Sequence, residues 1–160
     1  MKKWAGLLLA FLLLLGATAS AAVQLGDRAE DFSIVNSDGT VSTLSLMLAQ
    51  KKAVYVYFWA SWCGVCRFTK PEVARLRSEG ENVMTIALRS GNEAEVSRWL
   101  LRKGVEFPVI NDANGAISRS WAISVTPTLV VMSEGRVVST TSGWTSYWGM
   151  KLRLWWAKIF

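Results

Sequence analysis

Residues 54–66 read VYVYFWASWCGVC, and this stretch decides the fold because it joins an apolar strand to a pair of cysteines. Its first seven residues are apolar without alternation, which is typical of a strand buried on both faces of a largely parallel sheet. Cys63 and Cys66 are the only cysteines in the chain. A disulfide between them closes a very short loop, and the entropic stabilisation from a cross-link increases with loop length. We therefore expect the two cysteines to take part in a reaction and not to form an inert structural disulfide.

A helix is predicted from Cys63 onward. Pro71 falls within it and is expected to kink it, which is a structural role. One helical face is predicted to point inward and consists of Val65, Thr69, Val73 and Leu76. The charged side chains expected to lie mostly away from that face are Arg67, Lys70, Glu72 and Arg75.

Strand and helix signals alternate along the rest of the chain, without a linker or an internal repeat. Asn92 and Glu95 form a capping-box pattern that opens a helix, and Gly104 marks its end. The other predicted elements are a hairpin of residues 31–36 and 41–44 around a turn at 37–40, a strand at 83–88, a short helix at 116–121, strands at 128–132 and 136–141 around a turn at 133–135, and a helix at 148–160. This order predicts one α/β domain, a mixed sheet flanked by helices with an added N-terminal β-hairpin.

The final helix carries a stripe of large apolar side chains: Trp148, Leu152, Trp155 and Ile159. The usual amphipathic pattern predicts that this stripe packs the helix onto the sheet. The alternative is a stripe of tryptophans that faces a partner or a membrane, which would include Trp144 and Trp156.

Residues 1–21 have the pattern of an export signal, with Lys2 and Lys3 before an apolar block and Ala19-Ser20-Ala21 as a small-residue cleavage site. The apolar run at 4–17 has 14 residues, whereas a membrane-spanning helix needs about 20. A cleaved signal is therefore favoured over the alternative, a retained inner-membrane anchor. Export to the bacterial periplasm places the cysteines in a compartment where disulfides form and persist.

Charge and histidine content exclude several classes of function. Loss of Lys2 and Lys3 with the signal lowers the net charge from +6 to +4, and the bases are scattered, which disfavours nucleic-acid binding. The chain contains no histidine. The chain therefore lacks the usual base of a serine or cysteine hydrolase and the histidine ligands of the usual tetrahedral zinc sites. It also lacks the c-type haem attachment motif, because Arg67 and not histidine follows Cys66. No resident metal or cofactor is predicted.

Three motifs together resemble the thioredoxin superfamily: FWASWCGVC at 58–66, Pro71 within the next helix, and VTPT at 125–128 before a strand. Within the superfamily the chain resembles the exported TlpA-like branch. It is most similar there to the suppressor-of-copper-sensitivity protein D (ScsD-like) group of periplasmic disulfide oxidoreductases, through residues 87–91, 107–112 and 152–157. The resemblance begins near Gly26 and implies that residues 22–160 form one thioredoxin-like domain.

The resemblance also implies roles for individual residues. Cys63 lies at the start of a helix, where unpaired N–H groups favour a thiolate with a pKa of roughly 6 to 7.5, and would be the nucleophile. Cys66 would resolve the mixed disulfide. Pro127 would be a cis-proline opposite the pair, leaving the backbone of Thr126 free to bind a substrate strand. Trp62 would shield the site and contribute to docking, and a packing role is the alternative, which is compatible with docking. The implied partners are exported protein thiols or disulfides and a membrane redox protein that recharges the pair.

Two positions depart from the family pattern. Many relatives have a buried acid either six residues before the first cysteine or three residues after the second. In this chain these positions hold Tyr57 and Thr69. We therefore expect Cys66 to be harder to deprotonate than in those reductases, which disfavours a role in cytochrome maturation. The direction of the reaction, reductase or oxidase, is left open.

Copper(I) binding by the two thiolates is the main alternative function, because soft sulfur ligands select this ion. The five methionines are dispersed and no second ligand cluster occurs, so redox chemistry is favoured. A peroxidase is disfavoured because the cysteine motif of peroxiredoxins is absent.

Overall fold

The computed structural model describes residues 25–28, 31–35, 41–50 and 53–159. The predicted signal peptide at 1–21 and the whole predicted turn at 37–40 lie outside the described residues. Within the described part, none of the helices has both the length and the apolar character required to cross a bilayer.

A mixed sheet of five strands forms the centre of the fold, in the order β5-β4-β3-β6-β7. The central strand β3 (Ala53–Trp59) is buried throughout and lies parallel to β4 (Val83–Leu88), which lies parallel to β5 (Val109–Asp112). On its other side β3 pairs antiparallel with β6 (Thr128–Ser133), which pairs antiparallel with β7 (Arg136–Ser142). The prediction of a mixed sheet is confirmed.

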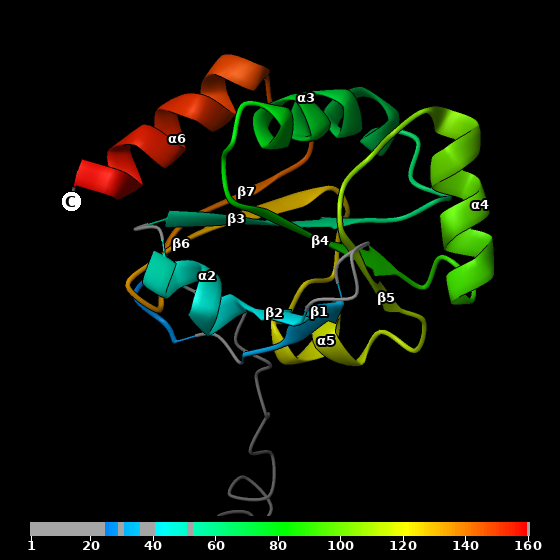
Figure 1. Cartoon of the computed structure of the whole chain (residues 1–160), viewed down its shortest axis with the longest axis horizontal. Helices are drawn as coiled ribbons and strands as arrows, with labels where there is room; N and C mark the ends of the chain where they lie inside the picture. The colour runs from blue at the N-terminus through cyan, green and yellow to red at the C-terminus, as the bar shows by residue number, and fades with distance from the viewer. Residues whose placement is uncertain (1–24, 29–30, 36–40, 51–52, 160) are drawn as a thin grey trace, which may run out of the picture.

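Helices cover both faces of this sheet, as predicted (Figure 1). Alternate residues of β3 point to opposite faces: Tyr57 and Trp59 belong to one apolar cluster, and Val56 and Phe58 to the other. The first cluster is covered by α3 (Cys66–Ser78), α4 (Glu93–Lys103) and α6 (Tyr147–Ile159). The second lies beneath α2 (Leu44–Gln50), α5 (Ala116–Ser120) and the hairpin of β1 (Ser33–Val35) and β2 (Val41–Thr43).

Two elements were not predicted from the sequence, α2 and β5. The helix α2 has only seven residues and follows β2 without a connecting loop. The strand β5 has four residues, follows Pro108 and ends in the polar pair Asn111 and Asp112. Both elements are too short for their periodicity to be recognised. They form because β4 and the second apolar cluster provide a surface on which to pack.

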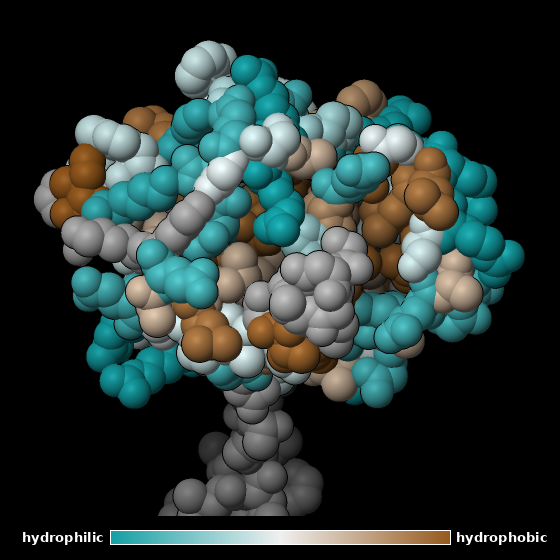
Figure 2. Space-filling view, in the orientation of Figure 1, coloured by the Kyte–Doolittle hydropathy of each residue, from teal (hydrophilic) through white to brown (hydrophobic). Residues whose placement is uncertain are grey.

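The prediction that Trp148, Leu152, Trp155 and Ile159 pack onto the sheet is wrong. These side chains are 52–73% exposed, and Figure 2 shows hydrophobic side chains on the surface over α6. The helix is apolar on two faces, and a different set packs inward: Tyr147, Met150, Leu154 and Ala157. Because the stripe points outward, the alternative remains that it faces a partner or a membrane.

Candidate functional site

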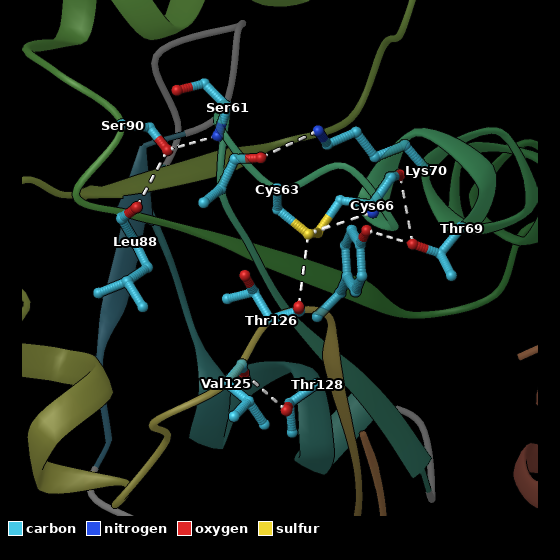
Figure 3. Close-up of a disulfide and its surroundings, with 12 residues drawn as sticks. Ser61, Cys63, Cys66, Thr69, Lys70, Leu88, Ser90, Val125, Thr126 and Thr128 are labelled. Carbon is cyan, nitrogen blue, oxygen red and sulfur yellow. Dashed lines mark hydrogen bonds between the residues drawn. A yellow bond between two sulfur atoms is a disulfide. The ribbon is translucent and has the colours of Figure 1, made fainter. Parts of the chain in front are cut away.

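The two cysteines lie between the end of β3 and the start of α3, where they form a disulfide with a Cα–Cα distance of 5.3 Å (Figure 3). Cys63 is partly exposed, whereas Cys66 is the first residue of α3 and is fully buried. The strand ends in a turn at residues 61–62, and the N–H of Cys63 donates to the carbonyl oxygen of Ala60 at 3.3 Å. The sulfur of Cys63 is therefore accessible, whereas the sulfur of Cys66 is buried.

The sulfur of Cys63 lies where the first turn of α3 has unpaired N–H groups. The N–H of Cys66 donates to Cys63 Sγ at 3.1 Å, so the helix start contacts the sulfur directly. Such N–H groups and the helix dipole stabilise a negative charge. In the reduced protein this arrangement lowers the free energy of a Cys63 thiolate relative to the thiol.

The loop before β6 faces the disulfide. The peptide bond between Thr126 and Pro127 is cis, as the resemblance implied. The carbonyl oxygen of Thr126 lies 3.4 Å from Cys63 Sγ, and Pro127 itself is buried. The structure thus brings Cys63 together with Thr126 and Pro127, which lie more than sixty positions later in the sequence.

Trp62 lies beside the pair with its side chain 64% exposed. Its indole N–H donates to the carbonyl oxygen of Arg89 at 3.0 Å, which fixes the ring over the end of β4. The preceding residue is held in the same region, because the N–H of Ser61 donates to Ser90 Oγ at 2.9 Å. Trp62 is therefore an anchored surface ring and not a core packing residue.

The two positions where relatives have an acid are in direct contact. Tyr57 and Thr69 share a buried hydrogen bond between their hydroxyl groups at 2.7 Å, and the hydroxyl of Thr69 also donates to the carbonyl oxygen of Cys66 at 3.3 Å. Burial raises the pKa of the Tyr57 phenol far above its ordinary value, so the phenol stays neutral near pH 7. Below Cys66 the site has a pair of neutral hydroxyls in place of a carboxylate.

Lys70 was expected to point mostly away from the inward face of the helix, and this prediction is wrong. Lys70 is 2% exposed, and its ammonium lies 4.3 Å from the ring centre of Trp59 and 3.9 Å from that of Trp99. The ammonium donates to the carbonyl oxygen of Ala60 at 3.2 Å. Val65, by contrast, is 43% exposed because it precedes the helix. The spacing of four residues from Cys66 was the one signal in the sequence for a buried Lys70.

Removal from water lowers the pKa of Lys70 to about 7, with a smaller contribution from the nearby charge of Lys103. The unfolded chain, in which lysine has its ordinary pKa, thus binds more protons than the folded protein between about pH 7 and pH 10. We expect the stability of the oxidised protein to rise with pH from 7 to 9.5. Lys70→Met should remove this rise and stabilise the protein at pH 7 by about 1 kcal/mol, because it removes a buried charge.

Urea unfolding of the oxidised protein at a series of pH values measures this effect, and Lys103→Met is the matched control. The disulfide keeps both cysteines from titrating during the measurement. A wild-type stability that is flat or falls from pH 7 to 9.5 would contradict the buried ammonium.

A metal site with three or more ligands would need side chains besides the two cysteines. Among the described residues, no group of three or more cysteine, aspartate or glutamate side chains is placed to hold a metal ion. Copper(I) binding in the described part of the chain would thus have no carboxylate cluster or further cysteine to add to Cys63 and Cys66.

Comparison with known proteins gives matches that cover most of the chain. The model of the Redoxin family matches residues 24–145. A thioredoxin-like protein of Haemophilus influenzae is 46% identical over 120 residues, covering 74% of this chain and 72% of the relative. The thiol-disulfide oxidoreductase ResA of Bacillus subtilis is 27% identical over 150 residues, covering 86% and 82%. A solved structure assigned as the thiol:disulfide interchange protein DsbE of Chlorobium tepidum is similar with a TM-score of 0.71 and 26% identity, covering 85% of this chain and 99% of that one.

Proposed function

We propose that this chain, which belongs to the Redoxin family and is a thiol–disulfide oxidoreductase of the thioredoxin superfamily, exchanges disulfides with exported proteins in the periplasm. The observation that carries the proposal is the Cys63–Cys66 disulfide at the start of α3, with the Thr126 carbonyl 3.4 Å from the accessible sulfur. The assignment to the periplasm is supported by the signal pattern at 1–21.

In the reduced protein, the Cys63 thiolate attacks one sulfur of a substrate disulfide, and the S–S bond of the substrate breaks. The leaving thiolate takes a proton, and a mixed disulfide joins Cys63 to the substrate. Cys66 then loses its proton and attacks Cys63 Sγ, which releases the second substrate thiol. Two electrons pass to the substrate and the Cys63–Cys66 disulfide forms. A membrane redox partner would return two electrons to the pair.

Substrate docking is assigned to Trp62, Thr126 and Pro127. The carbonyl oxygen of Thr126 faces Cys63, which supports a role for this backbone in holding an extended peptide beside the sulfur. Apolar side chains also lie exposed on the segments next to the pair, namely Trp62, Phe68 and Val125. These features suit an extended, partly unfolded protein segment as the substrate.

Cys66→Ala gives the direct test with a model peptide that contains a disulfide. We expect this variant to accumulate a mixed disulfide through Cys63, because it lacks the second thiol, whereas the wild type turns over. Mass spectrometry of the quenched reaction detects the adduct. The matched control is Cys63→Ala, which should form no adduct because Cys66 is buried.

The potential of the pair, measured against glutathione, decides the direction. A value near −270 mV, about that of thioredoxin, supports a reductase, and a value well above it supports an oxidase. Absence of the adduct, together with tight copper(I) binding that is lost in Cys63→Ser, would overturn the proposal in favour of copper binding.

A further inference from the structure

Lys70 is a buried cation that the fold alone does not explain. Among the described residues, none of the ion pairs of the structure involves it, so no carboxylate balances its charge there. A buried charge without a partner has a high free-energy cost. Two tryptophan faces and one carbonyl oxygen provide partial compensation.

The position of Lys70 brings its ammonium toward the cysteine pair. Cys66 and Lys70 are four residues apart on α3, so they lie one above the other on the same buried face. Side chains on a helix lean toward its N-terminus, and the ammonium of Lys70 reaches past the first turn to the carbonyl oxygen of Ala60. The same oxygen accepts the N–H of Cys63. The ammonium is therefore connected to the turn that holds the nucleophilic sulfur (Figure 3).

Among the described residues, the neighbouring groups considered as sources of this charge are neutral or lie farther than Lys70 from the ring of Trp99. Tyr57 on β3 and Thr69 on α3 form a neutral hydroxyl pair near pH 7. Lys103 on α4 lies farther away, 5.9 Å from the ring centre of Trp99. The pair itself gains a negative charge only when it is reduced.

We propose that Lys70 is a positioning residue for disulfide exchange, which fixes the turn before Cys63 and stabilises the Cys63 thiolate by its positive charge. This inference rests on the proposed function for its relevance to catalysis. The charge acts on the reduced state alone, because the disulfide is neutral. It therefore shifts the thiol–disulfide equilibrium toward the reduced form. Burial lowers the pKa of Lys70 to about 7 in the oxidised protein, and a Cys63 thiolate would raise it again, because a nearby negative charge favours the ammonium.

Lys70→Met and Lys70→Gln separate the two parts of the role. Methionine keeps the apolar stem without charge or hydrogen bond, and glutamine can still donate to the Ala60 carbonyl without the charge. In both variants we expect the midpoint of the iodoacetamide alkylation rate of Cys63 to move up by about one pH unit. The equilibrium with glutathione at pH 7 should move about threefold toward the disulfide. The control Lys103→Met should leave the midpoint within about 0.2 pH units, because its ammonium has no bond to the Ala60 carbonyl.

The inference is overturned if both variants fold, judged by circular dichroism, and keep the wild-type midpoint and equilibrium. If Lys70→Met does not fold, Lys70→Gln decides alone. A midpoint that moves in Lys70→Met but not in Lys70→Gln would replace the charge with the hydrogen bond as the cause, and so would also overturn the proposal as stated. Exchange with the model peptide is measured on the wild type in parallel. Failure of that exchange contradicts the proposed function, whereas the thiol titration still decides the role of Lys70.

Discussion

Cys63→Ser is expected to abolish disulfide exchange, lowering the rate by at least about a thousandfold. The serine hydroxyl stays protonated near neutral pH and does not form a disulfide, so no mixed disulfide can begin. Cys66 is fully buried and cannot replace the lost nucleophile. Turnover of the model peptide disulfide measures this loss.

Cys66→Ser is the control for the loss of the disulfide itself. Both variants lack the cross-link, and the closed loop is so short that its removal should cost about 2 kcal/mol of stability at most. Cys66→Ser keeps the accessible thiol and should complete the first half-reaction at close to the wild-type rate. Equal loss of that step in both variants would show that Cys63 is not the nucleophile.

Trp59→Ala is expected to lower the free energy of unfolding by about 3–5 kcal/mol, the usual cost of removing a large buried aromatic side chain. The ring is fully buried and packs against Trp99 and Phe107, with centroid distances of 5.3 and 5.9 Å. Its indole N–H donates to Thr85 Oγ1 at 3.3 Å, and this bond would be lost as well. Urea unfolding of the oxidised protein measures the change.

Trp62→Ala is the matched control, because Trp62 is only three residues away in the chain and is 64% exposed. We expect it to lower the stability by less than about 1 kcal/mol, since it loses one hydrogen bond and little buried area. Similar losses in the two variants would contradict the burial of Trp59 beneath α3 and α4.

Elements with strong local signals could be predicted from the sequence. The capping box is present as expected: the N–H of Glu95 donates to Asn92 Oδ1 at 3.0 Å, and the N–H of Asn92 donates to Glu95 Oε2 at 2.8 Å. Gly104 ends the same helix in the left-handed conformation, with φ of 59°. The apolar run of β3 likewise predicted the central strand of the sheet, and the two cysteines after it predicted the position of the site.

Features that depend on neighbours distant in the chain could not be predicted. The environment of Lys70 is formed by Trp59 on β3 and Trp99 on α4, and periodicity along one helix does not show either ring. The same holds for α6, where two apolar faces compete and the neighbouring elements decide which is buried. There the hydroxyl of Tyr147 donates to Glu79, and the guanidinium of Arg75 lies 4.0 Å from the Tyr147 ring centre. These contacts with α3 and the residue after it turn the tyrosine face inward.

The proposed role of Lys70 would add a proton exchange at its amine to the proton uptake that accompanies any disulfide reduction. Reduction of the pair adds two electrons, and a new Cys63 thiolate beside Lys70 would draw an additional fraction of a proton onto the amine near pH 7. The chain has no imidazole to mask this uptake. The number of protons bound per disulfide reduced would therefore be non-integral, and it would vary with pH near 7.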